Sequence, residues 1–291
     1  MFSRRFFVAA TATLAAFGSG PAHAQSRAIE VVASFSILAD LVRQVGGDRV
    51  QVRSIVPSGG DAHVYEPRPA DLAALNRARL VVINGLGFEE WADRMVRAAN
   101  YTGEKLVASR GVRALSVKGQ VDPHAWQDAA NVKIYIDNIR DALSKVDPAG
   151  AGVYASRAAA YQAQLDRLDA EIRGVLGRIP ATNRKVVTSH DAFHYFGDAY
   201  DVVFIAPQGI STDSAPSAQA VATIIRQIKD EGVRALFMEN MSSGRIVQQI
   251  ARETGVKVGG TLYADALGGG AASYLAMMRH NARTIASALA R

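Results

Sequence analysis

The chain has 291 residues, of which 49% are apolar and 7% aromatic, and it carries 33 basic against 27 acidic side chains. This mixture is typical of a folded globular protein and excludes a disordered or collagen-like chain. The sequence contains no cysteine, which excludes disulfides, thiolate metal sites and cysteine nucleophiles. A transition metal would therefore have to be held by carboxylates and by the six histidines.

Residues 1–24 have the pattern of a secretory signal peptide that is cleaved. Arg4 and Arg5 form a positive start, an apolar run extends from Phe6 to Phe17, and Ala22-His23-Ala24 is a small-x-small cleavage site. The alternative interpretation is a short membrane anchor, but the apolar run is too short to span a bilayer stably. Both general and twin-arginine export fit this start. We expect a periplasmic, soluble protein that is not lipid-anchored, because no cysteine is available as a lipid acceptor.

Short β-branched runs alternate with amphipathic stretches in the rest of the chain. In the first half, strands are predicted at residues 29–35, 50–56, 80–84 and 105–108, and helices at 37–45, 70–77 and 132–143. In the second half, strands are predicted at 185–188, 202–206, 235–239 and 256–262, and helices at 218–230 and 243–254. This alternation predicts an α/β fold with two lobes, residues 25–147 and 181–291, each a mainly parallel sheet with flanking helices.

One long helix is predicted between the lobes, over residues 148–180. Apolar and tyrosine side chains recur in it at helical spacing, Pro148 fits the start and Pro180 fits the end. About thirty residues at 1.5 Å per residue would extend roughly 45 Å. The alternative is two ordinary helices with a break near Gly150–Gly152. A single helix would join the two lobes and limit hinge motion between them.

Four residues with metal-binding chemistry lie at the boundaries of predicted elements. His63 and His190 follow predicted strands, Asp265 follows the last strand, and His124 precedes a helix. Ligands of open α/β sheets gather at the carboxyl ends of strands, and here each lobe supplies two residues. This arrangement predicts a site in a cleft between the lobes. For any one histidine alone, the competing interpretation is a surface or helix-capping residue.

The other histidines of the mature chain have different surroundings. His194 could pair with His190 at the i, i+4 spacing of a helix. However, His190 is expected to precede that helix, and the aromatic residues beside His194 indicate packing, so we do not assign it as a ligand. His280 lies on a basic terminal stretch and is expected to be exposed.

Four segments resemble the metal-binding solute-binding proteins of ABC importers, the ZnuA/TroA-like zinc/manganese family. They are Gly59–Pro67, Asp122–Trp126, Thr188–Phe193 and Leu262–Gly268. They occur in the order of that family and cover nearly the whole mature chain, with the long helix in the expected place. The resemblance implies that His63, His124, His190 and Asp265 hold one metal ion between two lobes. It also implies delivery of the metal to an ABC permease in the inner membrane.

The donor set favours zinc as the transported ion. Three neutral imidazoles and one carboxylate suit tetrahedral Zn²⁺, whereas manganese prefers more oxygen ligands. In relatives that bind manganese, the resemblance places glutamate where this chain has His190. Mn²⁺ and Fe²⁺ stay as alternatives for two reasons. Binding through both oxygens of Asp265 would shift the preference from zinc toward manganese. In addition, residues 87–122 lack the histidine-rich run that many zinc-specific relatives of the resembling family carry. Asp61, Glu66 and Glu239 are candidate acceptors for imidazole N–H groups, or else capping and salt-bridge residues.

A zinc-dependent hydrolase is the second functional hypothesis, with three histidine ligands, an open water position and Asp265 as general base. No catalytic motif of the Gly-x-Ser-x-Gly, His-Glu-x-x-His or phosphate-loop type occurs, so we expect no enzyme, no catalytic residue and no further cofactor. An adhesin or scaffold has no supporting feature. No cluster of basic residues indicates a nucleic-acid partner. We expect a monomer, and a periplasmic metallochaperone stays open as a second partner.

Overall fold

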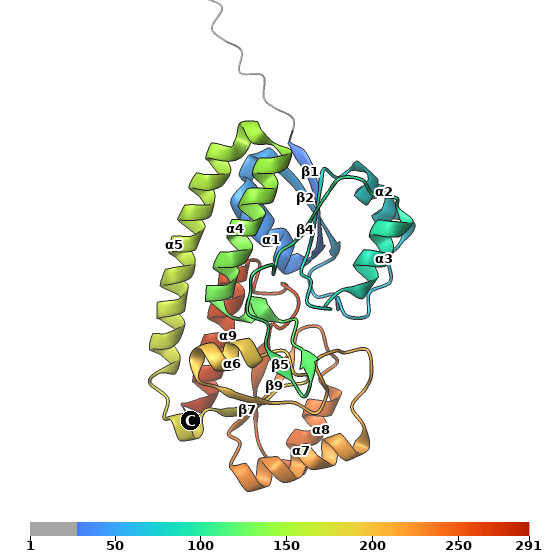
Figure 1. Ribbon diagram of the computed structural model, residues 1–291. Coiled ribbons are helices and arrows are strands. Elements are labelled where there is room, and N and C mark those ends of the chain that lie inside the picture. Colours follow the sequence, from blue (N-terminus) through green and yellow to red (C-terminus); the bar gives the residue numbers. More distant parts are fainter. Residues whose placement is uncertain (1–27, 291) are drawn as a thin grey trace, which may run out of the picture.

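Two four-stranded parallel sheets form the centres of two lobes in the computed structural model, which describes residues 28–290 (Figure 1). The first sheet contains β1 (Ile29–Phe35), β2 (Val50–Val56), β3 (Leu80–Ile83) and β4 (Glu104–Val107), in the order β2-β1-β3-β4. The second contains β7 (Lys185–Val187), β8 (Val203–Ile205), β9 (Ala235–Glu239) and β10 (Val258–Leu262), in the order β10-β9-β7-β8. Both sheets have the same topology, with the first and third strands of each lobe at the centre. The predicted signal peptide lies outside the described residues.

Helices flank both sheets. The first lobe contains α1 (Ser36–Gly46), α2 (Pro69–Arg77), α3 (Glu90–Ala98) and α4 (Ala129–Val146), and a hairpin of β5 (Ser116–Val117) and β6 (Gln120–Val121). The second contains α6 (His194–Tyr200), α7 (Ala218–Glu231), α8 (Arg245–Thr254) and α9 (Tyr274–Leu289). In Figure 1, α1 and α4 lie on one side of the first sheet, and α2 and α3 lie on the other. The α/β architecture predicted from strand–helix alternation is confirmed.

The predicted long helix is present as α5 (Ala151–Leu176), and it runs along the side of both lobes (Figure 1). Pro148 begins a short 3-10 turn before it, and α5 ends four residues before Pro180. Gly152 lies within the helix, so the alternative of two helices broken at this point is wrong. Its 26 residues extend about 39 Å. The helix packs against α1, α4 and α9. The limits proposed for the two lobes, residues 25–147 and 181–291, stay a prediction.

Some elements differ from the sequence-based expectation. The strands β3 and β7 each end one residue earlier than predicted. The short helix α3 was not predicted, although Trp91, Ala92 and Met95 form its buried face. Its first turn follows a loop of two glycines, which hid the helical pattern. The hairpin of β5 and β6 was also not predicted, since two-residue strands carry no detectable alternation.

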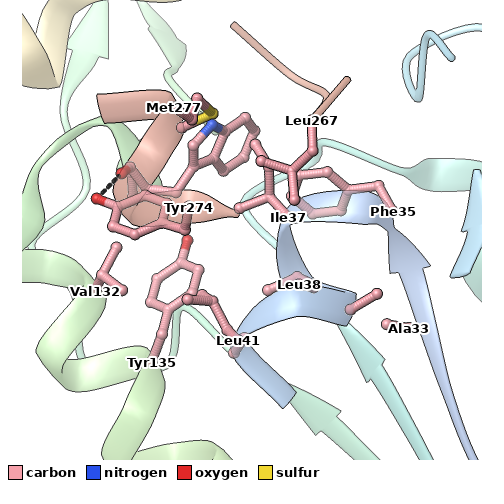
Figure 2. Close-up of a cluster of buried hydrophobic side chains, with 14 of the residues drawn as sticks. Ala33, Phe35, Ile37, Leu38, Leu41, Val132, Tyr135, Leu267, Tyr274 and Met277 are labelled. Atoms are coloured by element: carbon pink, nitrogen blue, oxygen red, sulfur yellow. Dashed lines mark hydrogen bonds between the residues drawn. The ribbon is translucent and has the colours of Figure 1, made fainter. Parts of the chain in front are cut away.

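The main hydrophobic core is continuous between the lobes. It includes residues of α1, α4, α5 and α9 together with strands of both sheets. Figure 2 shows this packing, with Leu38 and Leu41 of α1, Tyr135 of α4, and Tyr274 and Met277 of α9 lying side by side. A second, smaller cluster lies between the second sheet, α7 and α8. Within residues 28–290, no helix is both long enough and apolar enough to cross a membrane.

Candidate metal site

Three imidazoles and one carboxylate converge between the two sheets. The Nε2 atoms of His63 and His124 are 3.3 Å apart, and Nε2 of His190 lies 3.1 Å from Oδ2 of Asp265. The carboxylate oxygens of Asp265 also lie 3.4 Å from His63 Nε2 and 3.5 Å from His124 Nε2. Ligand atoms at tetrahedral zinc, with bonds of about 2.0–2.1 Å, are separated by about 3.3 Å. The four residues predicted from the sequence are therefore brought together at a spacing that fits one metal ion.

The loop after β2 places His63 at the edge of this cluster. The Oδ1 atom of Asp61 accepts a hydrogen bond of 2.9 Å from the backbone N–H of His63. The indole N–H of Trp91 donates to the carbonyl of Ala62 at 2.7 Å, which attaches the loop to α3. The ring of Phe88 packs edge-on against His63, with 4.7 Å between the ring centroids. These contacts hold both the backbone and the ring of His63.

Asp122 orients His124 from two residues away. Its Oδ1 atom accepts hydrogen bonds from the backbone N–H of His124, at 2.9 Å, and from ring Nδ1, at 2.7 Å. Both side chains are fully buried. With Nδ1 donating to a carboxylate, the tautomer is defined and Nε2 presents its lone pair to the site. The side-chain amide of Asn84 also donates to the carbonyl of Pro123, which fixes the turn between the two residues.

His190 follows β7, and Glu239 ends the adjacent strand β9. One oxygen of Glu239 accepts hydrogen bonds from the backbone N–H groups of Ser189 and His190, at 2.9 and 3.0 Å. The other oxygen lies 2.5 Å from Nδ1 of His190. Because β7 and β9 are neighbours in a parallel sheet, their carboxyl ends meet, and the carboxylate of one strand aligns the imidazole of the next.

Asp265 lies in the loop between β10 and α9, and the first lobe holds this loop. The indole N–H of Trp126 and the amide of Gln127 both donate to the carbonyl of Ala264, at 2.9 and 2.8 Å. The backbone N–H of Leu267 donates to Ser36 Oγ at 3.0 Å. The carboxylate of the second lobe is thus positioned by hydrogen bonds that come from the first.

The buried atoms of the cluster lack ordinary partners. Both oxygens of Asp265 and Nε2 of His190 are buried without a hydrogen bond of acceptable geometry. Buried polar atoms without a partner are costly, and a cation between these atoms would remove the cost. Burial would raise the pKa of Asp265, but the imidazoles of His190 and His124 outweigh it and hold this pKa well below its usual range. The carboxylate is therefore charged and ready to bind a cation.

The two buried imidazoles differ in basicity. Burial lowers the pKa of His124, which therefore stays neutral and able to bind a metal. Burial also acts to lower the pKa of His190, but the carboxylates of Glu239 and Asp265 outweigh it and raise this pKa well above the ordinary value. An incoming metal ion must therefore displace a proton from His190.

Of the three carboxylates expected to accept hydrogen bonds from the imidazoles, only one does so. Glu239 contacts an imidazole, Asp61 holds the backbone of His63 and not its ring, and Glu66 lines the cavity outside the site. Asp122 was not singled out, although the Asp-Pro-His order places its carboxylate two residues from the imidazole. That local spacing was the available signal. His194 is not part of the cluster, as expected, and its Nδ1 faces Asp122 instead.

A cavity of about 610 Å³ leads from the surface to His63. Both lobes line it, and its polar and charged side chains are Tyr65, Glu66, Glu90, Arg94, Gln120, Ser211 and Asp213. The side chain of His63 is 4% exposed, whereas those of His124, His190 and Asp265 are fully buried. A metal ion arriving through this cavity would meet His63 first.

Comparison with known proteins agrees with this geometry. The family model described as the periplasmic component A of a zinc-uptake complex, ZnuA, matches residues 31–288. The chain belongs to this family. Manganese-binding lipoprotein MntA of Halalkalibacterium halodurans is 34% identical over 90% of this chain and 88% of its own length. Iron-binding protein YfeA of Yersinia pestis is 33% identical over 84% of this chain and 80% of its own length.

The fold is shared with a solved member of the family. The periplasmic zinc-binding protein TroA of Treponema pallidum superposes with a TM-score of 0.87 and 30% identity, covering 91% of this chain and all of the other. The chain is therefore the substrate-binding component of a metal ABC transporter, and the ZnuA/TroA resemblance is confirmed. This family consists of solute-binding proteins, so the hypothesis of a zinc-dependent hydrolase is wrong.

The expectation of an unanchored, soluble periplasmic protein is contradicted by the same comparisons. MntA and further relatives are named lipoproteins, including the manganese-transport protein PsaA of Streptococcus mitis. The expectation rested on the absence of a cysteine, and that absence does not establish how a protein of this family is held at the membrane. We withdraw it.

Proposed function

We propose that this protein binds one Zn²⁺ ion through His63, His124, His190 and Asp265 and delivers it to the permease of its ABC transporter. The observation that carries this proposal is that the donor atoms all lie within 4.8 Å of one another, with 3.1–3.5 Å between Asp265 and each imidazole and 3.3 Å between His63 and His124. These distances match the edge of a small tetrahedron. Three of the four donors are nitrogens, and nitrogen-rich sets favour zinc over manganese. The ion is cargo, so it must also leave the site.

Manganese is the second candidate, and one feature of the site favours it. Both oxygens of Asp265 face the imidazoles, at 3.1–3.5 Å from their Nε2 atoms. Two-oxygen binding would raise the coordination number to five and add the oxygen donors that manganese prefers. The relatives named for manganese or iron are consistent with this candidate.

Calorimetric titration of the metal-stripped protein with Zn²⁺ and Mn²⁺ separates the two proposals. We expect one zinc ion to bind per chain, more tightly than manganese, and metal analysis of protein purified from its own host to find zinc. Tight manganese binding with weak zinc binding would overturn the zinc assignment and leave the site intact.

Substitution of single donors tests the site itself. His63→Ala and Asp265→Ala should each weaken binding of the preferred ion by at least about 100-fold, since each removes one of four ligands. His280→Ala is the matched control, because His280 does not belong to the cluster of four donors. Its imidazole is half-buried and not exposed as expected, and it contacts the carbonyl of Thr261, the side chain of Thr284 and the ring of Tyr263. Unchanged affinity in the first two variants would contradict the proposed ligand set.

A further inference from the structure

His194 lies next to the candidate metal site without belonging to it. It is the first residue of α6, four residues after His190, and its side chain is 27% exposed. Its Nδ1 atom lies 3.2 Å from Oδ2 of Asp122, which belongs to the first lobe. The contact therefore joins the lobe that carries His190 to the carboxylate that orients His124.

Asp122 is shared between two imidazoles. Its Oδ1 atom accepts a hydrogen bond of 2.7 Å from Nδ1 of His124, and its Oδ2 atom faces Nδ1 of His194. The carboxylate is fully buried, so its charge is compensated by these neighbours and not by water. A change of charge on His194 must therefore change how strongly Asp122 polarises His124.

The outer side of His194 faces a surface cavity of about 610 Å³, which is separate from the one that leads to His63. Lys118, at the turn of the β5–β6 hairpin, and Asp191 also line this cavity, and their charged atoms are 3.5 Å apart. The groups facing His194 are thus two carboxylates, Asp122 and Asp191, and one ammonium, Lys118. Contact with Asp122 raises the pKa of His194, with Asp191 acting in the same direction and Lys118 in the opposite one.

We propose that His194 is a positioning residue through which proton uptake at this second cavity lowers the affinity of the metal site. The proposal rests on the proposed function of the four-residue site. A proton on His194 draws the negative charge of Asp122 toward itself, so that His124 becomes a weaker donor. By linkage, a metal ion bound at His124 must in turn favour the neutral form of His194. Release would then be promoted at lower pH without a change in the ligands themselves.

The test compares zinc affinity of the full chain with that of His194→Gln, between pH 5.5 and 8.5, by competition with a chelator of known affinity. Glutamine keeps a neutral polar side chain beside Asp122 but cannot take up a proton. We expect equal affinities near pH 8 and about five-fold tighter binding by the variant near pH 6. A ratio of affinities that stays constant over this range would overturn the proposal.

A second measurement needs no substitution at His194. The pKa of its imidazole, followed by NMR, should be lower in the zinc-loaded protein than in the metal-free one, and identical values would overturn the proposal. Lys118→Gln should raise the same pKa, because the ammonium opposes protonation. A purely structural His194 would have the same pKa with and without zinc.

Controls separate this inference from the proposed function. His280→Gln removes a histidine outside the site, and the ratio of its zinc affinity to that of the unchanged chain should not depend on pH. If His63→Ala still binds zinc as the unchanged chain does, the proposed site fails. If His63→Ala loses zinc while the His194→Gln ratio stays constant, only the role of His194 fails.

Discussion

At the scale of single residues, two of the candidate imidazoles are each held by a buried carboxylate. Asp122 supports His124, and Glu239 supports His190, in both cases through Nδ1. Such partners fix the tautomer and increase the basicity of the donor nitrogen. The site therefore consists of more than its four ligands, and the supporting carboxylates should contribute to affinity.

Replacement of these carboxylates by their amides tests that contribution. Asp122→Asn and Glu239→Gln should each lower metal affinity by about 10–100-fold, because an amide polarises the imidazole less than a carboxylate. Titration calorimetry measures the change. Glu231→Gln is a suitable control, since Glu231 pairs with Lys185 on the surface. Affinity equal to that of the control would show that the carboxylates act only in folding.

The pH dependence of binding follows from His190. Glu239 and Asp265 raise its pKa above the ordinary 6.5 despite burial, so protons compete for Nε2 already near neutral pH. Metal binding requires the neutral ring, so affinity should be constant above this pKa and fall as the pH decreases through it. Chelator competition between pH 8 and pH 5 measures the effect. Affinity that is independent of pH from neutral to pH 5 would contradict the assignment of His190 as a ligand.

At the scale of elements, the loop between β3 and α3 forms a wall of the site. Gly85, Leu86 and Gly87 have φ angles of +85°, +56° and +81°, values that favour glycine and are uncommon for leucine. The loop places Phe88 between His63 and Trp126. Glu89 is buried beneath it and accepts hydrogen bonds from the backbone N–H groups of the loop start and from a serine of β1.

Glu89 should make stability depend on pH. Burial raises its pKa to about 7, from an ordinary value of 4.5, although its hydrogen bonds oppose the shift. Between these two values the folded state keeps a proton that the unfolded state has lost. The free energy of unfolding should therefore fall as the pH rises from 4.5 to 7, by about 3 kcal/mol from this residue.

Urea unfolding at several pH values measures this slope. Glu89→Gln cannot ionise and should show a flatter dependence between pH 4.5 and 7, whatever its absolute stability. Glu90→Gln, at the adjacent exposed position, is the matched control and should keep the original slope. Parallel curves for all three proteins would show that Glu89 does not titrate in this window.

At the scale of the whole molecule, one core connects the two lobes. The helices α1, α4, α5 and α9 pack together in it (Figure 2). Helix α9 begins beside α1 of the first lobe and ends beside β10 of the second. The backbone N–H of Tyr274, at the start of α9, donates to Asp40 of α1 at 2.8 Å. Separation of the lobes as rigid halves would break this packing, so movement of loops around the site requires less free energy.

A continuous core also predicts cooperative unfolding. Leu41→Ala removes a fully buried side chain of α1 and should lower the free energy of unfolding by about 2–5 kcal/mol. Circular dichroism and the fluorescence of Trp91 and Trp126 should report one coincident transition in both proteins. Val153→Ala, an exposed change on α5, is the control. Two separate transitions would show that the lobes unfold independently.

Much of the fold could be predicted from the sequence because its signals are local. The buried central strands β1 and β9 are nearly continuous apolar runs, and the edge strand β2 alternates apolar and polar residues, so the limits of all three agree with the predicted ranges. The long helix lies between two prolines and lacks internal breaks. The helix α3 and the small hairpin escaped prediction because one follows a glycine-rich loop and the other is too short to show a period.

The absence of cysteine, the motifs around His63, His124, His190 and Asp265, and their places beside predicted elements were determined by the sequence alone. These features depend on residue type and spacing, which are properties of short segments. Only the tertiary structure decided that Asp122 and Glu239 orient two imidazoles, and that His194 faces Asp122 from the other lobe. Such contacts join residues that lie up to 72 positions apart, and they form only when helices and sheets pack. The donor atoms can be proposed from the sequence, whereas the charges that tune them depend on the fold.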